Sequence, residues 1–308
     1  MQEFFNKSLG VRIGIGFGVA IFLSLFLYFA FSLLSPFVTP YTSKELVGVL
    51  ASGNWNETDK ISIFYLLSTQ TMCLFLLPAL ILLAAIYKKP SSILRENRMN
   101  YKDIRYSVFI LLILTVVTTN LPGINLLSDI NTQGFLKIIG GETSQQWIQY
   151  KQMERFTENL LDNNHLLLSI FCMAFIPAFC EEFFFRGFLQ TIAIRVIKNQ
   201  HIAIACTALI FSLMHGDIFN CIPRLILGMF LGYIFLYSRN ILFSIIAHTM
   251  HNAWVVLLSM PAFPDNIDTL GQMNNYPLLG IASLVILGLF MAVIIRKTKK
   301  VAITDNLS

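Results

Sequence analysis

Long apolar runs alternate with short polar connections along this chain of 308 residues. A helix needs about 20 mainly apolar residues to cross a bilayer. Eight runs approach that length, and the fifth and sixth are the shortest of them. The pattern therefore predicts an all-α, polytopic membrane helix bundle of about eight transmembrane helices. The expected spans are 11–35, 62–87, 106–127, 166–190, 202–217, 221–237, 240–260 and 277–295.

The connections divide the chain into four predicted regions. Residues 1–127 form an N-terminal three-helix membrane region, and 128–165 form a polar amphipathic insertion. Residues 166–260 form the membrane core that contains the candidate catalytic residues. Residues 261–308 hold the last span and a basic tail.

The polar insertion contains a predicted amphipathic helix from Ser144 to Leu161. Its apolar residues are expected to lie roughly on one face. Such a helix packs at the membrane surface, and a lid or substrate-guiding element is the alternative. The apolar residues are Trp147, Ile148, Met153, Phe156 and Leu160.

The composition supports the membrane class, since 56% of residues are hydrophobic and only 13% are charged. A soluble domain holds about 25% charged residues. The five cysteines form no C-x-x-C pair, which argues against a zinc ribbon or a thioredoxin-like site. The net charge of +5 comes mostly from residues beside apolar runs, so no nucleic-acid partner is expected.

The basic residues gather in alternate connections, which fixes an orientation. By the positive-inside rule, this distribution places both termini of a multi-pass cell-membrane protein in the cytoplasm. The connection 261–276 contains two Asp and no Lys or Arg. The basic residues are Lys7, Arg12, Lys88, Lys89, Arg95, Arg98, Lys102, Arg105, Arg195, Lys198, Arg239, Arg296, Lys297, Lys299 and Lys300.

Two adjacent carboxylates, Glu181 and Glu182, lie in a Phe-rich part of the fourth span. Charged groups inside apolar helices cost about 2.5–3.5 kcal/mol each on insertion scales, and they are functional candidates. Glu182 and Arg186 are four residues apart and can pair on one face. Glu181 points about 100° away and has no such partner in its helix, which suits a general base. Pro177 predicts a local kink or a wet pocket nearby.

Histidines mark two further spans. His215 ends the fifth span, and a lone buried histidine is more often a core residue than a catalytic one. His248 and Asn252, in the seventh span, are four residues apart and face the same way. The sixth span contains Gly228-x-x-x-Gly232, a pattern that allows close helix packing, and Arg224 near its end is expected to extend to the interface.

In order and spacing, these residues resemble the CPBP family, the Abi or CAAX-protease type family of intramembrane endopeptidases. The match covers about residues 160–258. Glu181, Glu182 and Arg186 meet the pattern E-E-x-x-x-R. Phe211 and His215 meet F-x-x-x-H, and His248 and Asn252 meet H-x-x-x-N.

The resemblance implies roles for these residues. Glu181, assisted by His215, would activate a water molecule, while His248 and Asn252 would bind the oxyanion and Glu182 and Arg186 would brace the site. No cofactor is expected. Zinc bound by Glu181, His215 and His248 is the alternative, disfavoured because the chain has no H-E-x-x-H pair.

The leading hypothesis is hydrolysis of a peptide bond in a membrane-associated protein or peptide, near the cytoplasmic face of the bilayer. The resemblance also leaves room for a non-catalytic membrane scaffold of the bacteriocin-immunity type. A proton-coupled transporter is the third possibility, because buried carboxylates can carry protons. The set of Glu181, His215, His248 and Asn252 favours the enzyme, because a proton path has no need of an oxyanion-binding Asn.

Overall fold

Helices account for all the regular structure in the part of the chain that the computed structural model describes. In hydrocarbon, a helix satisfies its own backbone hydrogen bonds, which is why apolar runs of this length fold as helices. The all-α, polytopic prediction is confirmed. The structure describes residues 9–42, 45, 48, 49, 56–86, 121–139, 141–161, 164–260 and 277–297.

Seven of the eight predicted spans correspond to apolar helices among the described residues. Five are long enough to cross a bilayer, and two are shorter. The third predicted span, 106–127, lies outside the described residues except for its last seven positions, so the total of eight stays a prediction. The long helices are Gly10–Val38, Thr58–Ala85, Leu166–Ile197, Ile218–Ser238 and Ile241–Leu258, and the shorter ones are Gln200–Met214 and Leu278–Val293.

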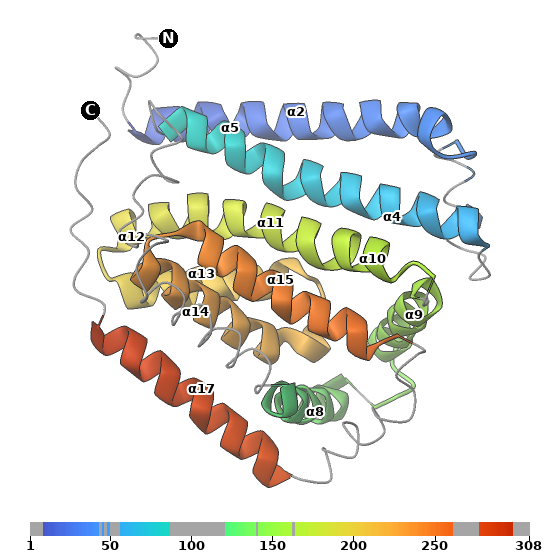
Figure 1. Ribbon diagram of the computed structural model, residues 1–308. Coiled ribbons are helices and arrows are strands. Elements are labelled where there is room, and N and C mark those ends of the chain that lie inside the picture. The colour runs from blue at the N-terminus through green and yellow to red at the C-terminus, as the bar shows by residue number, and fades with distance from the viewer. Residues whose placement is uncertain are drawn as a thin grey trace.

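The helices lie in layers (Figure 1). An outer pair, α2 and the helix formed by α4 and α5, covers one side of the bundle, and the helix from α10 to α12 lies beneath it. Next come α13, α14 and α15, and α17 and α8 close the opposite side. The outer helices are α2 (Leu9–Val38), α4 (Glu57–Thr71), a π-helical segment Met72–Leu76, α5 (Leu77–Ile86), α8 (Leu121–Ile139), α9 (Gln145–Leu160) and α17 (Pro277–Lys297).

The central layers consist of one long irregular helix and three regular ones. The long helix is interrupted twice by π-helical segments, which occur often at functional sites. Its parts are α10 (Leu166–Ser169), a π segment Ile170–Phe175, α11 (Ile176–Glu182), a second π segment Phe183–Gln190 and α12 (Thr191–Ile197). The others are α13 (Gln200–Met214), α14 (Cys221–Ser238) and α15 (Ile241–Leu258), with a 3-10 turn at Ile218–Asn220 before α14.

Two sharp reversals and the loop between α13 and α14 make α12, α13, α14 and α15 run alternately up and down. Lys198 and Arg239 adopt left-handed conformations, with φ of 60° and 51°, and end α12 and α14. Asn199 and Asn240 follow them and cap α13 and α15 through their side-chain oxygens. Both reversals therefore lie at one end of the bundle, while the loop between α13 and α14 lies at the other.

The polar insertion is more helical than its composition suggests. The predicted boundary between 127 and 128 falls inside α8, which continues to Ile139. Helix α9 forms as expected, with the Ser144 side chain accepting from the Trp147 backbone N–H. Its predicted apolar face is partly wrong, because Ile148 and Met153 are exposed.

The buried face of α9 is rotated toward Trp147, Tyr150, Phe156 and Leu160. Tyr150 and Trp147 stack on each other and contact Phe219. Leu160 is fully buried against α4 and the π segment Ile170–Phe175, and Phe156 packs on the same cluster. Aromatic and aliphatic contacts therefore hold both ends of this helix on the bundle.

Candidate active site

The two adjacent carboxylates end α11, between the two π-helical segments of the long helix. Pro177, one turn before Glu181, has no backbone N–H to donate, which fits the irregular backbone that precedes it. Glu182 is completely buried, and Glu181 is only 7% exposed. Their neighbours are mainly Phe side chains, including Phe179, Phe183 and Phe185.

Glu182 pairs with Arg186, as the spacing predicts. Nη1 of Arg186 lies 2.8 Å from Oε1 of Glu182. Nη2 of Arg186 donates to the backbone carbonyl of Gly228 on α14, at 3.0 Å. One turn later Gln190 donates to the carbonyl of Gly232, also at 3.0 Å. The glycine pattern of α14 therefore exposes two carbonyls to polar side chains of the neighbouring helix.

Glu182 also contacts His248, a partner that helical spacing alone does not reveal. Nδ1 of His248 lies 2.9 Å from the same Oε1 of Glu182 that Arg186 contacts. His248 is 2% exposed, so the contact is sheltered from water. A carboxylate at Nδ1 is a hydrogen-bond acceptor and fixes the ring orientation, so Nε2 of His248 is directed to the other side.

His215 is the residue immediately after the last residue of α13, and its ring is fixed from within its own helix. Nδ1 of His215 lies 2.7 Å from the backbone carbonyl of Phe211, so this nitrogen is the donor. The Phe211 ring packs edge-on against His215 and His248, and the Arg186 guanidinium lies 5.1 Å from its centre. The Phe211 ring thus lies against His215, His248 and Arg186, and the Phe211 carbonyl orients the His215 ring.

The structure brings Glu181, His215 and His248 together from three helices. Nε2 of His215 and Nε2 of His248 each lie 3.9 Å from Oε2 of Glu181. These separations exceed direct hydrogen-bond distance, yet one water molecule can reach both a ring nitrogen and the carboxylate. Oε2 of Glu181 is buried and accepts no hydrogen bond from any described residue.

Asn252 is not joined to this cluster. It lies one turn beyond His248 on α15 and is partly buried, and its side chain makes no hydrogen bond with the described residues. Its position on the same helical face still allows it to reach a ligand bound beside His248. Its predicted role stays a prediction.

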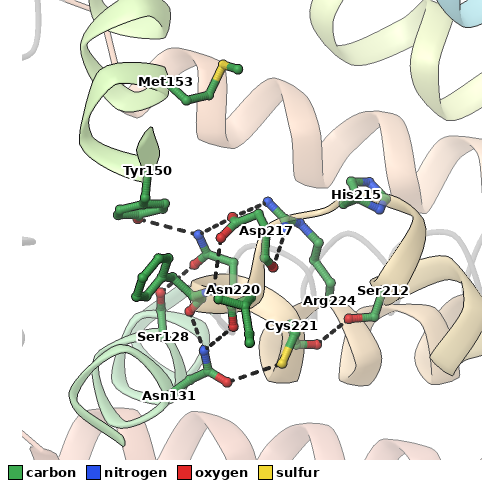
Figure 2. Close-up of polar contacts among 12 residues, drawn as sticks. Ser128, Asn131, Tyr150, Met153, Ser212, His215, Asp217, Asn220, Cys221 and Arg224 are labelled. Atoms are coloured by element: carbon green, nitrogen blue, oxygen red, sulfur yellow. Dashed lines mark hydrogen bonds and ion pairs between the residues drawn. The ribbon is translucent and has the colours of Figure 1, made fainter. Parts of the chain in front are cut away.

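A polar network holds the loop that follows His215, and the sequence did not reveal it (Figure 2). Asp217 accepts from the Phe219 backbone N–H, from Asn220 and from Arg224, at 2.9, 2.9 and 2.8 Å. Arg224 therefore pairs with Asp217, a partner that the sequence did not indicate. The signal in the sequence was Asp217 two residues before an N–H that it could cap.

Neighbouring helices complete this network. Asn131 of α8 donates to the carbonyls of Ile218 and Phe219, and Ser212 of α13 donates to the carbonyl of Cys221. Asn220 contacts the hydroxyl of Tyr150 on α9. Helices α8, α9, α13 and α14 thus all contribute to the position of the loop beside His215.

A cavity of about 1020 Å³ lies between α9, this loop and the end of α15. Of Glu181, His215 and His248, it is His215 that lines this cavity. Figure 2 shows Tyr150 and Met153 of α9 across from His215 and Arg224. The remaining wall is mostly polar on α9 and apolar on α15, where Val255, Leu258 and Met260 contribute.

The donor types of the cluster suit zinc, since carboxylate and imidazole are its ordinary ligands. The spacing does not fit it. Among the described residues, no group of three His, Cys, Asp or Glu side chains is arranged to hold a metal ion. A carboxylate and two imidazoles can also act on a water molecule without a metal ion.

Comparison with known proteins agrees with the location of this cluster. Residues 163–254 match the family model described as type II CAAX prenyl endopeptidase Rce1-like. The chain is 26% identical over 252 residues to an uncharacterized protein of Mycoplasma capricolum subsp. capricolum, covering 80% of this chain and 67% of the relative. No solved structure matches the chain. The matched region contains every residue of the cluster.

Proposed function

Because residues 163–254 form an Rce1-like domain of the CPBP, or CAAX-protease type, family, we propose that this membrane protein is an intramembrane endopeptidase that hydrolyses its substrate with a water molecule activated by Glu181. The substrate is a membrane-associated protein or peptide. The supporting family match covers the long irregular helix, α13, α14 and most of α15.

One observation carries the proposal. Oε2 of Glu181 is buried, accepts no hydrogen bond from the described residues, and lies 3.9 Å from a ring nitrogen of His215 and of His248. An unsatisfied buried carboxylate oxygen is costly, and Oε2 of Glu181 lies beside two ring nitrogens that a bound water molecule could also contact. A water molecule held there by Glu181 and His215 would satisfy the oxygen and stand beside the cavity.

The reaction then follows from the groups present. Glu181 takes a proton from the water molecule while the water oxygen attacks the carbonyl carbon of the scissile bond. Nε2 of His215 is the acceptor nitrogen of its ring, because Nδ1 donates to Phe211, so it orients the second water proton. Glu181 returns its proton to the leaving nitrogen when the C–N bond breaks.

The oxyanion needs donors on the other side of the attacked carbon. The Glu182 carboxylate at Nδ1 orients His248, and the Nε2 side of this ring faces the site and serves as a donor to the oxyanion. Asn252, one turn further along α15, supplies a second donor once a substrate is bound. Arg186 keeps Glu182 in place through its contact at 2.8 Å.

We propose that no metal takes part and that both termini are cytoplasmic. The metal-free reaction rests on the spacing of the cluster and on the absence of an H-E-x-x-H pair. The orientation rests on the distribution of Lys and Arg among the connections.

The test compares wild-type protein with Glu181→Gln, which keeps the shape of the side chain but cannot take up a proton. Mass spectrometry of peptide termini in membranes that contain either form identifies the cleaved substrate. Cleavage of that substrate in liposomes should then fall at least about 100-fold in Glu181→Gln.

Glu142→Gln is the matched control, since Glu142 is exposed and lies in a turn before α9. It should cleave like the wild type. Activity of the wild type should also survive exhaustive chelation. Normal cleavage by Glu181→Gln would remove Glu181 from the reaction, and activity lost on chelation and restored by zinc would replace the metal-free proposal.

A further inference from the structure

The two ends of the central bundle differ in charge. The reversals at Lys198 and Arg239 lie at one end, which we call the basic end. Helix α5 also ends there, at Ile86, and the chain that follows carries six Lys or Arg between residues 88 and 105. Helix α17 reaches the same end with Arg296 and Lys297 (Figure 1).

The opposite end carries both signs of charge. Helix α9 and the loop from His215 to Asn220 lie there, with Glu154 and Asp217 among their charged residues. The segment 261–276, which leaves α15 at this end, contains two Asp and no Lys or Arg. Because the positive-inside rule depends on Lys and Arg in short connections, it assigns the basic end to the cytoplasm.

The cavity beside His215 lies at this opposite end. Its walls are α9, the loop between α13 and α14, and the last turn of α15, which are all remote along their helices from Lys198 and Arg239. His215 connects the cavity with the cluster, since its ring contacts the cavity and its Nε2 lies 3.9 Å from Glu181.

Packed side chains separate the cluster from the basic end. Arg186 and Gln190 follow Glu181 toward that end, and each is 1% exposed and bonded to a carbonyl of α14. Leu231 and Ile234, on the same helix as these carbonyls, are also fully buried. These four described side chains are buried, whereas His215 on the other side of the cluster borders the cavity.

We propose that substrate reaches Glu181 through this cavity from the side of the membrane opposite the basic end, and that it is an exported or extracytoplasmic membrane-associated peptide segment. This inference rests on the proposed peptidase function. It differs from the expectation of proteolysis near the cytoplasmic face, which was made from the sequence without information on where the cavity opens.

Cysteine labelling tests the direction of the cavity without any peptidase assay. Gln149→Cys places a thiol on the cavity wall of α9, and Lys198→Cys places one at the basic end; both positions are exposed. The unsubstituted chain is the blank, since none of its five cysteines lines the cavity. A membrane-impermeant maleimide is applied to intact cells and to permeabilised cells.

Gln149→Cys should be labelled equally in both preparations, and Lys198→Cys should gain at least about tenfold on permeabilisation, because a bilayer excludes a charged reagent. Glu142→Cys, in the turn before α9, is the second variant and should behave like Gln149→Cys. The reverse pattern at these positions would overturn the proposal.

A second arm tests entry of the substrate itself. A bulky maleimide attached to Gln149→Cys in intact cells should lower cleavage of the identified substrate at least about tenfold, since it occupies the cavity in front of His215. Unchanged cleavage by fully labelled protein would overturn entry through the cavity. An inactive wild type with the expected labelling pattern would instead refute the peptidase function and leave the orientation of the cavity standing.

Discussion

Among single residues, Glu182 joins an ion pair within the long helix to a contact with a histidine of α15. Its Oε1 contacts both Arg186 and His248, at 2.8 and 2.9 Å, in a fully buried setting. Buried ion pairs contribute little net stability, but removal of one partner leaves an uncompensated charge. Glu182 therefore links the fold of the long helix with the orientation of a proposed oxyanion donor.

This link predicts different outcomes for the two halves of the pair. Glu182→Gln should lower the free energy of unfolding by about 3–5 kcal/mol, because it leaves the Arg186 charge buried and unpaired. Arg186→Gln should cost a similar amount for the opposite reason. The double variant should lose less than the sum of the two, and thermal unfolding of all four proteins in detergent measures the difference.

Cleavage by the same four proteins distinguishes the pairing of Glu182 with Arg186 from its role in orienting His248. Arg186→Gln retains the carboxylate beside His248, so its cleavage per folded molecule should exceed that of the double variant. Strict additivity of the unfolding free energies would show that Glu182 and Arg186 do not act as a pair. Equal activity of Arg186→Gln and the double variant would show that Glu182 does not serve His248.

The sequence predicted part of this site because residues four apart in a helix lie on the same face. Helical spacing gave the Glu182–Arg186 pair and the shared face of His248 and Asn252. The meeting of Glu181, His215 and His248 came from the family resemblance, since spacing within one helix says nothing of contacts between helices. The Asp217 and Arg224 contact was missed because it closes a loop, where no period applies.

At the scale of elements, α14 packs by exposing the backbone of two glycines. A Cβ at Gly228 would lie 3.0 and 3.1 Å from Cβ and Cα of Ala208 and 3.2 Å from the Phe211 ring, on α13. Without a side chain there, its carbonyl is also open to Arg186. The small-xxx-small pattern thus supports the site as well as the packing expected of it.

Gly228→Ala should therefore damage both stability and catalysis. The added methyl group pushes α13 away at Ala208 and Phe211, at a cost of about 1–3 kcal/mol for overpacking. Phe211 orients His215, so cleavage per folded molecule should also fall. Thermal unfolding and the liposome assay measure the two effects.

Gly288→Ala on α17 is the matched control, because nothing lies within 4 Å of a Cβ there. It should leave cleavage unchanged and stability equal or up to about 1 kcal/mol higher, from helix propensity. Equal behaviour of the two variants would contradict the close approach of α13 and α14.

Hydrophobic pattern predicted the existence of the elements better than their ends and faces. The eight apolar runs have helices wherever the structure describes them, since hydrocarbon leaves the backbone no alternative. The boundary predicted at 127 lies inside α8, which continues through polar residues whose side chains bond to the α13–α14 loop. The face of α9 was partly misjudged because it depends on contacts with other segments, such as the packing of the Tyr150 ring against Phe219.

At the scale of the whole molecule, α9 is a fixed wall of the cavity. The sequence left a lid and an interfacial helix as alternatives. The structure packs the first half of α9 against the α13–α14 loop through Trp147 and Tyr150, and buries its last residue between α4 and the long helix. The Leu161 side chain that follows packs on Val256 and Met260 of the α15 end. Contacts at both ends with different parts of the bundle oppose motion as a lid.

This attachment predicts the exchange behaviour of α9. Its backbone amides should be protected from hydrogen–deuterium exchange along the whole helix, because opening requires loss of buried contacts at one end or the other. Trp147→Ala removes the stacking on Tyr150 and the edge contact with Phe219, worth about 0.5–1.5 kcal/mol per aromatic pair beyond the area buried. Protection should then fall in the first half of the helix and persist near Leu160. Arg155→Ala, an exposed position outside the cavity wall, is the control and should change neither half.

A lid would exchange rapidly along its whole length in the wild type, and its exchange would slow when substrate binds. The fixed wall gives slow exchange with or without substrate, so mass-spectrometric exchange of peptides that cover 145–160 distinguishes the two.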